Sequence, residues 1–161
     1  MEISMIDPLK AAAHEALQGQ KAAMRSIVGG MSSEGLNWKP AGPGGAGGSE
    51  TNSIAQMLSH ALEAERFLVL TAIDEQMDRN REAQFQVMVN SAEEMIEQID
   101  RTEQEVNEAL DRLTADHLGQ EISRTTRTRT GAWWLLHAIE HSNEHVGQAS
   151  LTRQLYERSV G

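Results

Sequence analysis

Three of the chain's six histidines, His137, His141 and His145, follow one another at intervals of four residues. In a helix this spacing places the side chains along one face, where two neighbouring imidazoles can chelate one ion. Zinc sites in enzymes commonly use three protein ligands and leave a further position open for water or substrate. Packing alone makes little use of stacked imidazoles, because their protonation would place like charges one turn apart. We therefore predict that His141 and His145 bind a metal ion.

A third ligand has to come from another part of the chain, and the best candidate is His60. It belongs to an apolar helical stripe with Met57, Ala64 and Phe67, so it should point into the interior of a bundle. Taken alone, a histidine in such a stripe is more often a hydrogen-bonded structural residue than a ligand. The chain contains no cysteine, so any metal site must use histidine or carboxylate ligands.

Four stretches with the hydrophobic spacing of amphipathic helices would position these histidines. They run from Pro8 to about Val28, from Glu50–Ser53 to about Asp74, along an apolar stripe from Phe85 to Leu113, and from Gly131 to about Arg158. The alternation typical of β-strands is missing. We predict an all-α, four-helix-bundle fold that forms a single domain over residues 1–161.

Two of the connections between these helices are predicted to be long. The first contains a flexible glycine-rich loop at about residues 39–50. The second, Thr114–Thr130, is polar, and we expect it to wrap around the bundle, although the Thr/Arg alternation of Arg124–Thr130 would also suit a short extended piece. The connection between the second and third helices is short, which favours antiparallel neighbours.

Charge and composition narrow the range of partners. A formal net charge of -10 argues against nucleic acid, which is bound through a clustered basic surface. The start, Met1–Ile6, lacks the basic and apolar regions of a signal peptide, and no apolar run approaches the length of a membrane span. We expect a cytoplasmic protein that binds neither nucleic acid nor a membrane.

Three sequence landmarks together resemble the DinB-like (DinB/YfiT) superfamily of metal-dependent four-helix-bundle proteins. They are Leu-Asn-Trp-Lys-Pro at 36–40, Ile54-x5-His60, and His137-x3-His141-x3-His145-x-Gly-Gln. The resemblance covers nearly the whole chain, and the last landmark is the most specific. The resemblance implies that His60, His141 and His145 are the metal ligands, and that His137 supports the site or packs beside it.

The resemblance also implies a class of activity. Several branches of the superfamily use low-molecular-weight thiols such as mycothiol or bacillithiol in transferase or isomerase reactions, and others are assigned as hydrolases. We hypothesise a metal-dependent enzyme with zinc or nickel as cofactor, a small-molecule substrate and a homodimeric assembly. Glu144 is the only candidate for a catalytic base. The alternative is a non-catalytic bundle that acts as a metal-binding or protein-interaction module.

Two further motif matches and the remaining histidines are interpreted as having no catalytic or binding role. Residues 141–145 match the H-x-x-E-H pattern of inverted zinc proteases, but only sixteen residues follow, too few for the distant acidic ligand of such enzymes. Residues 42–47 match G-x-G-x-x-G, yet no strand precedes them and Gly48 stands where a phosphate-binding lysine belongs. His14 and His117 are interpreted as surface residues. The roles of the three tryptophans stay open.

Overall fold

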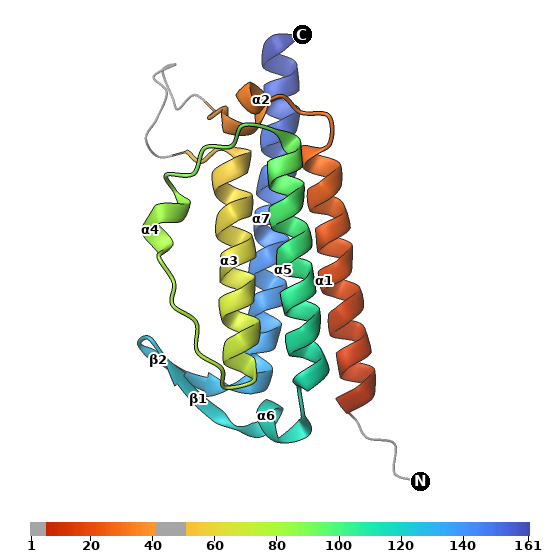
Figure 1. Cartoon of the computed structure of the whole chain (residues 1–161), viewed down its shortest axis with the longest axis vertical. Helices are drawn as coiled ribbons and strands as arrows, with labels where there is room; N and C mark the ends of the chain where they lie inside the picture. Colours follow the sequence, from red (N-terminus) through yellow and green to blue (C-terminus); the bar gives the residue numbers. More distant parts are fainter. Residues whose placement is uncertain (1–5, 41–50) are drawn as a thin grey trace.

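The computed structural model of the chain describes residues 6–40 and 51–161. Within these residues four long helices pack side by side as a bundle (Figure 1): α1 (Ile6–Val28), α3 (Ile54–Ala72), α5 (Ala92–Arg112) and α7 (Gly131–Val160). This architecture confirms the predicted all-α class. The predicted glycine-rich loop lies, from residue 41 onward, outside the described residues. None of the described helices is long and apolar enough to cross a membrane.

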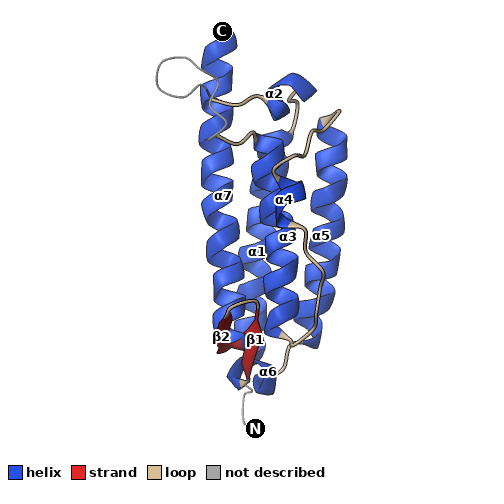
Figure 2. Cartoon of the chain, turned by 90° about the vertical axis from the view of Figure 1, so that its left-hand side faces the viewer, coloured by secondary structure: helices blue, strands red, loops and turns tan. Residues whose placement is uncertain are grey.

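Short elements complete the described part of the chain. They are α2 (Ser33–Asn37), α4 (Arg81–Gln84), α6 (Ala115–Gly119), β1 (Glu121–Arg124) and β2 (Arg127–Thr130). The hairpin of β1 and β2, the α4 turn and the chain leading into it all lie on one side of the bundle (Figure 2).

The preferred prediction, that Thr114–Thr130 wraps the bundle as an irregular connection, is wrong, and so is the expectation that strands are absent. The alternative of a short extended piece at Arg124–Thr130 is confirmed in β2. The segment contains α6 and an antiparallel hairpin, in which Ile122 pairs with Arg129. The indole Nε1 of Trp134 donates a hydrogen bond of 3.2 Å to the carbonyl oxygen of Ile122, and the Ile122 side chain is buried. Ile122 therefore anchors the hairpin to the bundle. The other strand residues are polar, so the sequence of the hairpin shows no hydrophobic alternation.

The third predicted helix begins later than its apolar stripe suggested. Ser91 caps α5, because its hydroxyl accepts a hydrogen bond from the backbone N–H of Glu94. Phe85 instead ends the short helix α4, and Met88 is 71% exposed in the following segment. The helical spacing of Phe85 and Met88 with the residues of α5 is therefore coincidental.

This later start reverses the expected direction of α5. Side-chain contacts join Ser59 to Gln98 and Glu75 to Arg112, so corresponding ends of α3 and α5 lie at the same end of the bundle and the helices run parallel. Figure 1 shows the segment that connects them: it leaves the lower end of α3, runs back up the left-hand side of the bundle through α4 and enters the upper end of α5. A 21-residue helix is about 30 Å long, and the 19 residues between α3 and α5 can span about 60 Å when extended. The prediction of antiparallel neighbours is therefore wrong.

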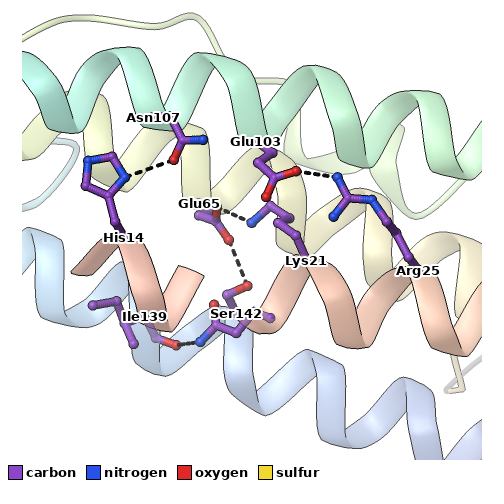
Figure 3. Close-up of polar contacts among 9 residues, drawn as sticks. His14, Lys21, Arg25, Glu65, Glu103, Asn107, Ile139 and Ser142 are labelled. Carbon is purple, nitrogen blue, oxygen red and sulfur yellow. Dashed lines mark hydrogen bonds and ion pairs between the residues drawn. The ribbon is translucent and has the colours of Figure 1, made fainter. Parts of the chain in front are cut away.

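A polar layer crosses the middle of the core (Figure 3). Lys21 of α1 forms an ion pair with Glu65 of α3, and the other carboxylate oxygen of Glu65 accepts a hydrogen bond of 2.9 Å from the hydroxyl of Ser142 on α7. All three side chains are buried. Separate hydrophobic clusters lie on either side of this layer. Because buried charges are costly when unpaired, the layer favours one axial register of α1, α3 and α7.

Candidate metal centre

The three predicted ligands come from two helices that face each other. A capping box of Ser53 and Gln56 fixes the start of α3 and so places His60 in its second turn. His141 and His145 lie one turn apart on α7, which packs against α3. Residues 85 positions apart in the sequence thus meet within one layer of the bundle.

The three imidazoles converge on a common point. The ring centroid of His60 lies 5.2 Å from that of His141 and 5.0 Å from that of His145, and the ring centroids of the two α7 histidines are 4.6 Å apart. One ring nitrogen from each residue lies within 4.8 Å of the other two. No other group of three or more metal-binding side chains gathers in this way within residues 6–40 and 51–161. The structure therefore brings together the set that the sequence singled out.

Gln84 fixes the orientation and tautomer of His60. The Nδ1 atom of His60 lies 3.0 Å from Oε1 of Gln84. The amide Nε2 of Gln84 donates to the carbonyl oxygen of Asn80, which leaves Oε1 to face the ring as an acceptor. The contact with Gln84 is shorter than the 3.5 Å between His60 Nδ1 and the donor Nη2 of Arg79, so it favours the tautomer in which Nδ1 donates its proton to Gln84 and Nε2 keeps a free lone pair.

Gln148 acts on His145 in the same way. Its Oε1 lies 2.8 Å from Nδ1 of His145, and its Nε2 donates to a carboxylate oxygen of Glu144. Nδ1 of His145 is therefore the protonated nitrogen, and Nε2 is available to a metal. Histidine ligands in metal sites are usually held by such a hydrogen bond to their second nitrogen.

Burial keeps two of the imidazoles neutral. Burial, together with the smaller effect of the neighbouring histidines, lowers the pKa of His60 to about 4 and the pKa of His141 to about 3. Nδ1 of His141 is buried and has no hydrogen-bond partner among the described residues. Neutral imidazole is the form that binds a metal.

These features fit a divalent metal of the first transition row. Imidazole nitrogen suits zinc, copper, iron and nickel, whereas magnesium and calcium prefer oxygen ligands. Zinc–nitrogen bonds are about 2.0–2.1 Å long, so the three nitrogens, which lie within 4.8 Å of one another, would draw together around one ion. Because no carboxylate joins the cluster within the described part of the chain, three protein ligands would leave a coordination position open.

An open pocket of about 420 Å³ lies beside two of the histidines. His60 and His141 form part of its wall, and α3, α7 and the turn of the β1–β2 hairpin supply most of the rest. Phe67 and Trp134 are among its apolar walls. A small molecule in this pocket would reach the histidine cluster.

Comparison with known families agrees with this fold. The family model of the DinB superfamily matches residues 16–149, which is most of the chain. The chain belongs to the DinB superfamily. No curated protein sequence matches it.

Solved structures similar to this DinB-superfamily chain include three bacterial proteins, each 17% identical to it. A conserved protein from Enterococcus faecalis has a TM-score of 0.71, with 91% of this chain and 95% of that chain covered. A DinB-like protein from Bacillus subtilis has a TM-score of 0.67, with 89% and 90% covered. A DinB-like protein from Bacillus cereus has a TM-score of 0.65, with 87% and 89% covered. At this identity the likeness concerns the fold.

The other residues highlighted by the sequence take several positions. His137 lies one turn before His141, stacks on Trp133 at 4.7 Å and lines the pocket. Glu144, the candidate base, is exposed and does not line the pocket; its catalytic role stays a prediction. His14 is partly buried and its Nδ1 lies 3.1 Å from Oδ1 of Asn107, whereas His117 helps to cap α6.

Gln84 and Arg79 are the residues at the site that the sequence did not reveal. Both lie in the segment that returns from α3 to α5, where Gln84 is buried against His60. Nη2 of Arg79 lies 3.5 Å from Nδ1 of His60. The one local signal is Asn80, whose side chain caps the short helix carrying Gln84, and such a cap says nothing about a distant histidine.

Proposed function

We propose that this chain binds one zinc or nickel ion through His60, His141 and His145 and is a metal-dependent enzyme acting on a small molecule. The observation that carries the proposal is the convergence of three imidazoles from two helices beside an open pocket. When bound, such an ion acts as a Lewis acid and can activate water or a thiol. The chain's own contribution is to hold the imidazoles in the correct tautomer and to confine the substrate next to them.

The superfamily suggests two reaction classes for this site: thiol-dependent transfer and hydrolysis. Phe67 and Trp134 favour a substrate with an apolar part, because they line the pocket beside His60. A low-molecular-weight thiol is our preferred co-substrate. The same proposal places the protein in the cytoplasm, where such thiols are kept reduced.

Metal analysis of untagged protein, purified without chelators and then incubated with zinc or nickel, tests the first part of the proposal. We expect about one equivalent of metal in the parent, and loss of that metal in His60→Ala and in His141→Ala. The matched control is His137→Ala, which removes an imidazole one turn away and should retain the metal. An absence of metal in the parent, or full retention in both ligand variants, would contradict the proposal.

A second candidate, a metal-binding module without catalysis, is favoured by one observation. Among the described residues that line the pocket there is no carboxylate to serve as a base. Protein loaded with cobalt(II) separates the two functions, since its visible spectrum reports the ligands of the ion. A spectral change on adding cysteine would support an open position for a thiol, whereas an unchanged spectrum would favour the module.

We also propose that the protein forms a homodimer. Leu151 and Leu155 lie one turn apart on α7 and are 57% and 40% exposed, so they would form the apolar centre of a contact with a second copy. Light scattering at several concentrations measures the mass directly. A monomer at all concentrations would rule out this assembly.

A further inference from the structure

The pocket beside the histidines has a charge opposite to that of the protein. The chain has 24 acidic and 14 basic residues, yet the described residues that line this pocket include three arginines, Arg79, Arg81 and Arg127, and no aspartate or glutamate. A cavity lined by one sign of charge concentrates ligands of the other sign.

Arg79 lies at the inner end of this arrangement and its charge is poorly compensated. Its nearest carboxylate partner, Glu63, is 4.0 Å away, and its Nε atom is buried without a hydrogen-bond partner among the described residues. The side chain is 20% exposed and packs over the ring of Phe67 at 5.6 Å. Burial lowers the pKa of Arg79, but a guanidinium stays charged in proteins.

Arg81 and Arg127 line the same pocket from two different segments. The guanidinium of Arg81 lies 5.9 Å from the ring of Phe85, and that of Arg127 lies 5.9 Å from the ring of Trp133. Neither forms an ion pair with a carboxylate within the described residues. Stacking on an aromatic ring holds a guanidinium in place while leaving its N–H donors free for an acceptor.

We propose that this pocket is a receptor for an organic anion, in which the arginines bind a carboxylate or phosphate group and Phe67 and Trp134 contact an apolar body. Arg79 binds the charged group closest to the histidines, because its guanidinium lies next to His60. This inference rests on the proposed function and names its substrate class: a small amphipathic anion, not a neutral molecule. The fork of N–H donors on a guanidinium matches the two oxygens of a carboxylate or phosphate.

Calorimetric titration of the metal-free protein at low ionic strength tests the proposal. The probes are 3-phenylpropionate, phenyl phosphate and the neutral 3-phenylpropanamide. We expect at least one of the two anions to bind more tightly than the amide, and the stronger anion identifies the preferred group. Removing metal beforehand prevents the probe from being held by an ion at the histidines.

Two arginine variants and one control assign the binding to this pocket. In Arg79→Gln the dissociation constant of the preferred anion should rise by about tenfold to a hundredfold, as expected for a charge-assisted hydrogen bond. Arg127→Gln should also weaken binding, and because Arg127 is exposed on β2 its loss leaves the core intact. Arg101→Gln removes the same charge from an exposed position on α5 outside this pocket and should bind like the parent.

The outcomes separate this inference from the metal proposal. Lost anion binding with unchanged metal content in Arg79→Gln supports the anion receptor. Equal binding of amide and anions, absence of anion binding, or parental affinity in both Arg79→Gln and Arg127→Gln would overturn it. Failure of the metal proposal would instead appear as a metal-free parent in the metal analysis, whatever the titration shows.

Discussion

Two of the three histidines are held by a glutamine rather than by a carboxylate. Gln84 accepts from Nδ1 of His60 and Gln148 accepts from Nδ1 of His145. A neutral acceptor selects the tautomer without adding negative charge to the site. The charge of a bound divalent ion would then remain uncompensated by the chain, which suits the binding of an anionic substrate.

Replacing Gln84 by leucine should weaken zinc binding by about tenfold to a hundredfold, because His60 loses the partner that orients its ring. Competition against a chromogenic chelator measures the affinity. Gln84→Glu keeps an acceptor and should bind zinc more tightly than the leucine variant. Gln86→Leu, at an exposed position two residues along, is the control, and equal affinities in Gln84→Leu and Gln86→Leu would show that Gln84 does not position His60.

The metal-free protein should lose stability as the pH falls from about 6.5 toward 4. The pKa of His60 is about 4 and that of His141 about 3 in the folded chain, whereas an unfolded histidine titrates near 6.5. In this range the unfolded chain binds more protons than the folded chain, so acid favours unfolding. Urea unfolding at pH 7.5 and 5.0 should show a smaller loss in the His60→Gln/His141→Gln variant than in the parent. An equal loss would exclude these two groups as the cause.

At the scale of elements, the polar layer of Lys21, Glu65 and Ser142 is the most unusual feature of the core. Lys21 is 1% exposed and Glu65 is fully buried, so neither charge is solvated. The layer lies between residues that otherwise form apolar stripes on α1, α3 and α7. Helices shifted by one turn would separate the charges, which is the physical reason for its effect on register.

Lys21→Met should destabilise the protein by about 3–5 kcal/mol, because it leaves the Glu65 carboxylate buried without its cation. The double variant Lys21→Met/Glu65→Leu removes both charges and should recover much of that loss. Urea unfolding gives the free energies of all three proteins. If the double variant were less stable than Lys21→Met, the ion pair would not be the origin of the effect.

Two helical glycines should respond to alanine in opposite ways. A Cβ at Gly131 would lie 2.0 Å from the carbonyl oxygen of His117 and 2.7 Å from that of Ala72, so Gly131→Ala must displace backbone and destabilise the fold. A Cβ at Gly147 would meet no atom of the described chain within 4 Å. Gly147→Ala should therefore stabilise α7 by up to about 1 kcal/mol. Thermal unfolding distinguishes the two, and a stabilising Gly131→Ala would contradict the close packing of α6 against α7.

At the scale of the whole molecule, the metal centre links two helices that the sequence keeps far apart. Zinc bound by His60 on α3 and by two residues of α7 binds only the folded chain in this geometry. Added zinc at a hundred times its dissociation constant should stabilise the protein by about 2.7 kcal/mol, or roughly 5–10 °C in Tm for a chain of this size. Thermal scans with and without zinc should show this rise in the parent and in His137→Ala, but not in His141→Ala. A rise of the same size in His141→Ala would place the zinc elsewhere.

The parallel direction of α3 and α5 also affects the arrangement of the whole molecule. It obliges residues 73–91 to run back along the bundle, and this return brings Arg79, Arg81 and Gln84 beside the histidines. An antiparallel α5 joined to α3 by a tight turn would leave no segment there. The pocket and the contact of Gln84 with His60 are therefore consequences of the topology.

The sequence by itself determined the helical class, the extents of the long helices apart from the start of α5, and the histidines that meet. Helical periodicity and the four-residue spacing of His141 and His145 are local properties, so they can be read without knowing what lies opposite. His60 could be named because its apolar neighbours direct it to the interior, where another helix has to lie.

Only the tertiary structure decided the direction of α5, the hairpin, the partner of His60 and the arginine-lined pocket. Each of these depends on contacts between residues far apart in the chain, such as Gln84 with His60 and Trp134 with Ile122. The segment 73–91 carries no reliable local signal, because apart from the four-residue helix α4 its backbone follows the surface of the bundle. Its position is fixed by where the packed helices leave space, which no local pattern contains.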